Sequence, residues 1–169
     1  MASRSKAKIP MGKNIGTQGD DPKGDALETH NRLRAKHNAP ALSLDSKLTN
    51  HAQEYADQLL GQGKEVKAAH SKWAKNFGEG LQILSKYKYP ISTVLDSWYT
   101  AESAKFNWKV KNYTDGCGHL TQMIWKETAK LGVGYATDHN PDRTIIVLLY
   151  DPTGNVFHTF GKNIEAAKK

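Results

Sequence analysis

The six consecutive apolar residues of Ile145–Tyr150 limit the fold of this chain more than any other feature of its sequence. The run is far too short to span a bilayer, which requires about 20 apolar residues in a helix. Together with Thr144 it predicts a strand over 144–150 that is covered on both faces. A second strand is predicted over 131–137, and the connecting residues 138–142 have the composition of a turn. We therefore expect an antiparallel hairpin inside a sheet that has helices above and below it.

Four stretches outside the hairpin have the apolar spacing of helices. They cover residues 25–37, 46–60, 92–106 and 120–130. Asp45 is expected to cap the second helix and Ser92 the third, whereas Pro40 follows the end of the first. The stretch 64–80 is predicted to be irregular. Helices on both sides of a mostly antiparallel sheet predict the α+β class, as a three-layer α–β–α sandwich.

The chain is expected to contain one folded domain, over residues 24–165, because 169 residues are enough for a single well-buried core. Residues 1–23 are basic and polar and contain few large apolar side chains, so they predict a flexible N-terminal arm. Residues 166–169 are expected to form a short basic C-terminal tail.

Cysteine content and charge indicate the compartment and the partners. Cys117 is the only cysteine, so no internal disulfide can form, which fits a reducing compartment. The N-terminus lacks the apolar segment of a secretory signal, and a cytoplasmic, non-secreted protein is therefore expected. The net charge of +7 favours an anionic partner, whether phospholipid headgroups, inositol phosphates or nucleic acid, and charge alone does not choose among them. Nucleic acid is the partner that we least expect.

Several short motifs follow one another along the chain. Residues 118–128 read Gly-His-Leu-Thr-Gln-Met-Ile-Trp-Lys-Glu-Thr, and residues 150–156 read Tyr-Asp-Pro-Thr-Gly-Asn-Val. The shorter matches are His30-Asn31, His70-Ser71, Gly78-Glu79-Gly80-Leu81, Trp98-Tyr99 and Leu131-Gly132-Val133-Gly134. In this order the motifs resemble the CAP superfamily of cysteine-rich secretory, antigen-five and pathogenesis-related proteins.

Two positions depart from the pattern of that superfamily. Leu120 stands where the family usually has an aromatic ring, and Leu148 stands where secreted members have a cysteine. Because the disulfide cysteines are absent, the resemblance is greatest to the intracellular, Golgi-associated branch. It covers about residues 26–164, nearly the whole predicted domain.

The resemblance implies a cleft that gathers His70, Glu79, Glu102 and His119. His70 and His119 would be the metal ligands, because neutral imidazole nitrogens suit zinc or another divalent cation. Glu79 and Glu102 would fix the ring tautomers or accept a proton. Two histidines leave coordination positions open, so weak binding of the ion is expected, and no catalytic residue is established by the resemblance.

The position of Glu102 departs from the family pattern, which is Trp-x-x-Glu. Here three residues instead of two separate Trp98 from Glu102. One extra residue turns a helical side chain by about 100°. We therefore expect either a bulge in this helix that restores the direction or a carboxylate that points away from the cleft. Gly78 and Gly80 are predicted to need backbone angles that other residues avoid.

The resemblance implies a membrane-peripheral module that binds anionic lipid or sterol, on the cytosolic face of the Golgi or of another membrane. One alternative is a zinc-dependent hydrolase in which Glu79 or Glu102 is the general base. The sequence contains no HExxH pattern, so we favour the binding module over the enzyme. Another alternative is a scaffold for protein partners that is able to form homodimers.

Overall fold

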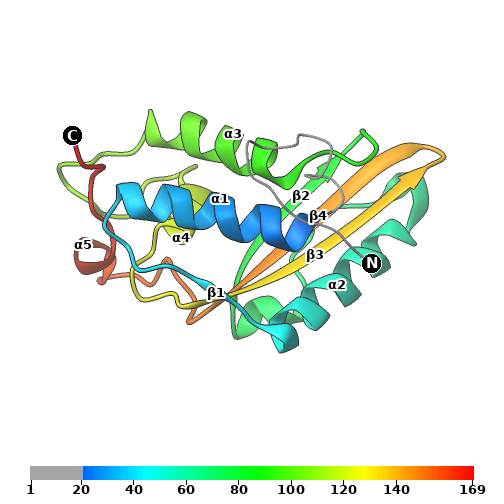
Figure 1. Cartoon of the computed structure of the whole chain (residues 1–169), viewed down its shortest axis with the longest axis horizontal. Coiled ribbons are helices and arrows are strands. Elements are labelled where there is room, and N and C mark those ends of the chain that lie inside the picture. Colours follow the sequence, from blue (N-terminus) through cyan, green and yellow to red (C-terminus); the bar gives the residue numbers. More distant parts are fainter. Residues whose placement is uncertain (1–20) are drawn as a thin grey trace.

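The computed structural model describes residues 21–169, so residues 1–20 of the predicted arm lie outside the described residues. The helices are α1 (Pro22–Lys36), α2 (Ser46–Leu60), η2 (Gly63–Glu65), η3 (Lys72–Lys75), α3 (Ile91–Ser103), α4 (Gly118–Met123) and α5 (Phe160–Asn163). The strands are β1 (Ser43–Leu44), β2 (Gly78–Leu84), β3 (Lys130–His139) and β4 (Asp142–Asp151). They form one sheet with helices on both faces (Figure 1), which confirms the predicted α+β sandwich.

The sheet has the order β1-β3-β4-β2. β3 and β4 pair as the expected antiparallel hairpin, β2 runs antiparallel to β4, and only the short β1 is parallel to its neighbour. The prediction of an irregular stretch over 64–80 is wrong at its end, because Gly78–Leu84 is a strand. Glycine has a low intrinsic propensity for strands, so the local sequence does not predict one here. Pairing with β4, which begins with Gly78 opposite Tyr150, nevertheless makes these residues a strand.

Strand β4 separates two apolar cores. Ile146, Leu148 and Tyr150 belong to the core beneath α1, α3 and α4. Ile145, Val147 and Leu149 belong to the core beneath α2. Successive side chains of a strand point to opposite faces, so an apolar residue at every position is what a strand between two helical layers requires.

Helix α2 lies directly on the backbone of β3. A Cβ atom added to Gly132 would be 2.4 Å from the Leu48 carbonyl carbon, and one added to Gly134 would be 2.2 Å from the Ala52 carbonyl oxygen. The Gln53 side chain fastens the same contact, because its Oε1 accepts from the Tyr135 backbone N–H at 2.9 Å. These glycines allow the close approach that fixes α2 on the sheet.

The beginnings of two helices differ from the predictions. Helix α1 starts at Pro22, ahead of the predicted residue 25, because the Asp21 carboxylate accepts from the Gly24 N–H at 3.1 Å. Ser92 does not cap α3. The Ser92 N–H instead donates to the Asp25 carboxylate of α1 at 2.9 Å, so the third helix is capped from the first. No helix within residues 21–169 is long and apolar enough to cross a membrane.

Helix α4 ends at Met123, seven residues before the predicted end at residue 130, and the buried Arg34 explains the difference. Its guanidinium donates to the carbonyls of Met123 at 3.0 Å, Trp125 at 2.8 Å and Thr128 at 2.9 Å. A longer helix would need these carbonyls for its own hydrogen bonds. Burial lowers the pKa of Arg34 to about 10, so the side chain still carries its charge at neutral pH.

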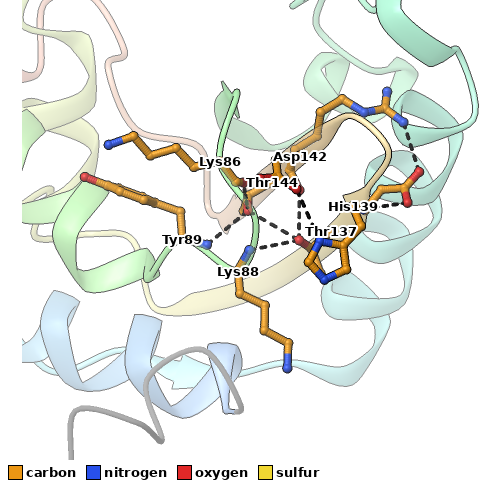
Figure 2. Close-up of polar contacts among 9 residues, drawn as sticks. Lys86, Lys88, Tyr89, Thr137, His139, Asp142 and Thr144 are labelled. Atoms are coloured by element: carbon orange, nitrogen blue, oxygen red, sulfur yellow. Dashed lines mark hydrogen bonds and ion pairs between the residues drawn. The ribbon is translucent and has the colours of Figure 1, made fainter.

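At the far end of the hairpin, two threonine hydroxyls hold the loop between β2 and α3 (Figure 2). Thr137 Oγ1 accepts from the Lys88 backbone N–H, and Thr144 Oγ1 accepts from that of Tyr89, both at 3.0 Å. Thr144 Oγ1 also donates to the Lys86 carbonyl at 2.6 Å. The entry to α3, whose last turns border the cleft described below, is therefore tied to the sheet.

The close contact of α2 with β3 leads to a stability prediction. Gly134→Ala should lower the free energy of unfolding by at least about 2 kcal/mol, because the added methyl group meets backbone atoms that cannot move independently. Gly161→Ala is the matched control, since nothing lies within 4 Å of its added Cβ. Urea unfolding measures both variants, and equal stabilities would contradict the described packing.

Candidate functional site

A cleft of about 500 Å³ opens between β2, α3, α4 and the segment that follows β4. All four residues that the resemblance implied line it: His70, Glu79, Glu102 and His119. They come from three distant parts of the chain and meet at one end of the sheet because β2 pairs with β4 and the third and fourth helices pack together.

The first pair in the cleft is His70 with Glu79. Glu79 Oε1 lies 2.7 Å from His70 Nδ1 and also accepts from the Ser71 backbone N–H at 3.0 Å. Glu79 Oε2 accepts from the Ser71 hydroxyl. The Glu79 side chain is only 1% exposed, whereas the His70 side chain is 70% exposed. A buried carboxylate with fixed donors therefore orients an imidazole at the rim, and Ser71 is a member of the site that the sequence did not identify.

The second pair is His119 with Glu102. Glu102 Oε2 lies 2.8 Å from His119 Nδ1, and Oε1 accepts from the Leu120 backbone N–H at 2.9 Å. The Trp98 ring stacks on the His119 ring with centroids 3.9 Å apart and an interplanar angle of 14°. The hydrogen bond to Glu102 and the stacking on Trp98 together hold the His119 imidazole in one orientation.

Neither alternative predicted for Glu102 is correct. Helix α3 is α-helical throughout Ile91–Ser103 with no bulge, and the Glu102 carboxylate points into the cleft. Glu102 is four positions after Trp98, which leaves the two side chains about 40° apart around the helix axis. The family spacing of three positions would leave them about 60° apart in the opposite direction. Both spacings keep Trp98 and Glu102 on one face, so the extra residue is tolerated.

The floor of the cleft depends on Gln122, which the sequence did not single out. Its Oε1 accepts from the Gly154 N–H at 2.9 Å, and its Nε2 donates to Thr128 Oγ1 at 3.1 Å. A Cβ atom at Gly78 would lie 2.0 Å from that Oε1. The prediction that Gly78 and Gly80 need unusual backbone angles is therefore wrong, because neither has a positive φ. Gly78 is instead needed because a side chain there would clash with Gln122. Gln122 lies inside the 118–128 motif, the only signal that pointed to it.

The two imidazoles present similar chemistry to the cleft. A carboxylate only accepts hydrogen bonds, so Nδ1 of His70 and of His119 carries a hydrogen, and in the neutral ring the lone pair is then on Nε2. A carboxylate behind a histidine is the usual support for a metal ligand, so the donor set fits a cation such as Zn²⁺. Within residues 21–169, no group of three or more His, Cys, Asp or Glu side chains is placed to hold an ion. The rings would thus supply two ligands, and water or a bound molecule the rest.

A buried polar pair lies behind the cleft wall. The Tyr150 hydroxyl is 2.8 Å from His30 Nε2, and His30 Nδ1 is 2.8 Å from the Ala26 carbonyl oxygen. Burial lowers the pKa of His30 to about 4, and the nearby Arg34 charge acts in the same direction. Burial raises the pKa of Tyr150. Both side chains are therefore neutral at neutral pH and join α1 to β4.

Comparison with known proteins gives consistent matches. A family model described as "CAP: Cysteine-rich secretory protein family" matches residues 27–150. Golgi-associated plant pathogenesis-related protein 1 of Homo sapiens is 34% identical over 161 residues, covering 94% of this chain and 100% of that protein. Pathogenesis-related protein 1 of Arabidopsis thaliana is 29% identical over 141 residues, 83% of each chain. A solved structure described as "Crystal structure of NaASP2 with Zn2+" has a TM-score of 0.66 at 22% identity, covering 94% of this chain and 92% of that one.

The buried His30 leads to a pH prediction. The pKa of His30 is about 4 in the folded protein, whereas an unperturbed histidine has a pKa of 6.5. Between these two pH values the unfolded chain therefore binds more protons than the folded protein. The free energy of unfolding should therefore fall as the pH decreases through this window, by about 3 kcal/mol in total from this group. His30→Gln, which retains a partner for Tyr150, should flatten the dependence, whereas His139→Ala at an exposed site should not. Urea unfolding at several pH values tests this, and an unchanged slope in His30→Gln would count against it.

Proposed function

The chain belongs to the CAP, or cysteine-rich secretory protein, family, and on that premise we propose that it is a binding protein whose cleft holds a divalent cation at His70 and His119. The observation that carries the proposal is that each imidazole is held through Nδ1 by a carboxylate that is almost fully buried. Such support places the hydrogen of the neutral ring on Nδ1 and orients Nε2, the nitrogen through which a neutral histidine then binds a metal.

The chemistry of the cleft suits a weakly held, exchangeable ion. Two protein ligands leave several coordination positions for water or for an oxygen of a bound molecule. A bound cation would supply positive charge and Lewis acidity at the mouth of the cleft. His70 and His119 would hold it, Glu79 and Glu102 would fix their tautomers, and Trp98 would keep the His119 ring in place. One structural relative, NaASP2, was crystallised with Zn²⁺.

Binding accounts for the geometry better than a zinc hydrolase does. Glu79 accepts from the His70 ring and from both the backbone and the hydroxyl of Ser71. Glu102 accepts from the His119 ring and the Leu120 backbone. A general base needs a carboxylate oxygen within reach of the water that it deprotonates. Both carboxylates are instead engaged in orienting imidazoles, which supports binding over hydrolysis.

A second proposed activity is peripheral binding to membranes that contain anionic lipid, on the cytosolic face of the Golgi or of another membrane. The net charge of +7 favours it, since basic proteins are attracted to anionic lipid surfaces. The name of the human relative associates that protein with the Golgi. Binding of sterol and homodimerisation stay predictions from the family resemblance.

Calorimetric titration with Zn²⁺ tests the proposed cation site. The wild-type protein should bind one ion, and the double variant His70→Ala/His119→Ala should bind none. Glu102→Gln should weaken binding by about 10- to 100-fold, because the His119 ring loses its charged support. His139→Ala, at an exposed histidine in the hairpin, is the matched control and should bind like the wild type. Unchanged affinity in the double variant, with its circular dichroism preserved, would refute the site.

A further inference from the structure

An apolar surface lies at the end of the molecule that carries α5 and the C-terminus (Figure 1). The described residues include six large hydrophobic side chains that are well exposed, and four of them are here: Val110, Tyr113, Val156 and Phe157. Val110 is 63% exposed and Phe157 is 61% exposed. They come from the loop before α4 and the segment before α5, and none of the four lines the cleft.

The rings of this surface form one supported group. The Tyr113 and Phe157 centroids are 5.4 Å apart, and each lies 6.4 Å from the Phe160 centroid. Phe160 is buried and packs edge-on against the buried Trp125 at 4.9 Å. The exposed rings thus rest on the core of the protein, which reduces the entropy lost when they bind a partner.

The two segments that carry these side chains are rich in lysine. Residues 104–116 and 156–169 contain six lysines and two acidic residues. Of the two acids, Glu165 pairs with Lys126 at 2.5 Å, and Asp115 accepts from the Tyr113 hydroxyl at 3.2 Å. Of the six lysines, Lys162 pairs with Glu127 at 3.5 Å, and among the described residues no carboxylate forms an ion pair with Lys105 or Lys109. The two segments therefore combine exposed apolar side chains with a positive net charge.

We propose that this surface, formed by Val110, Tyr113, Val156 and Phe157 with the surrounding lysines, docks the protein on an anionic phospholipid bilayer. The inference rests on the proposed affinity for anionic lipid and assigns that affinity to a place. Aromatic rings are favoured at the level of the headgroups, and each lysine near an anionic surface adds to binding. The positive charge of the two segments favours a surface that is negative throughout, as an anionic bilayer is. A second copy would set the same lysines against each other.

Docking in this way gives the cleft a defined place on the membrane. Asn155 and Gly116 line the cleft, and they adjoin Val156 and the loop that carries Tyr113. The Asn155 side chain donates to the Gly118 carbonyl at 3.0 Å and so ties the two segments together at this rim. One edge of the cleft then lies at the headgroup level when the surface is bound.

Vesicle co-sedimentation tests the surface. The full-length protein is mixed with phosphatidylcholine vesicles with or without phosphatidylserine, over a series of salt concentrations. The wild type should bind the anionic vesicles, and the binding should weaken with salt. The variants Tyr113→Ser/Phe157→Ser and Lys105→Glu/Lys109→Glu should each bind about tenfold more weakly. The matched controls are Tyr87→Ser, at a ring that is 36% exposed in another loop, and Lys64→Glu/Lys67→Glu, and they should keep more of the affinity.

The outcomes separate the surface from the general lipid proposal. A wild-type protein that binds neither kind of vesicle would overturn both. If the wild type binds anionic vesicles and Tyr113→Ser/Phe157→Ser binds equally well, the assignment to this surface is wrong while the lipid proposal stands. If that variant converts a dimer to a monomer in analytical ultracentrifugation and leaves vesicle binding unchanged, the surface is an interface between copies. Unchanged Zn²⁺ affinity and circular dichroism show that a variant is folded.

Discussion

The burial of strand β4 on both faces is the constraint on which the rest of the structure depends. Its alternate side chains enter two cores, one beneath α2 and one beneath α1, α3 and α4. Because β4 is central, it also pairs with β3 on one side and β2 on the other. The second pairing carries Glu79 to the end of the sheet, where the segment after β4 forms another wall of the cleft. The site is thus a consequence of the same strand that organises the core.

The cleft itself combines rigid support with an open face. The carboxylates of Glu79 and Glu102 are buried and satisfied by fixed donors, whereas the imidazoles that they hold reach the solvent. Gln122 closes the floor by binding the backbone after β4. The cost of orienting each ring is met during folding, so a ligand does not have to supply it. This arrangement favours reversible binding at the cleft.

Sequence reasoning succeeded where a pattern has one physical solution. The apolar run of β4, the hairpin and the motifs that pointed to the CAP family were confirmed. It failed where a distant residue decides a local feature. Asp25 caps α3 in place of Ser92, Arg34 ends α4 early, and pairing with β4 makes a strand of residues that include two glycines. For Glu102, the residue count correctly gave a rotation of about 100°. It did not show that a side chain three or four positions after Trp98 lies on the same helix face.

The central claim is that two imidazoles, each held through Nδ1 by a carboxylate, offer Nε2 to a cation. Nitrogen-15 NMR of the histidine rings measures this directly, because the shifts of the two ring nitrogens report which one carries the hydrogen. Before metal is added, His70 and His119 should both be in the Nδ1–H form, and Zn²⁺ should then shift the Nε2 resonances of these two rings alone. Rings in the Nε2–H form, or Nε2 resonances that do not respond to Zn²⁺, would contradict the account.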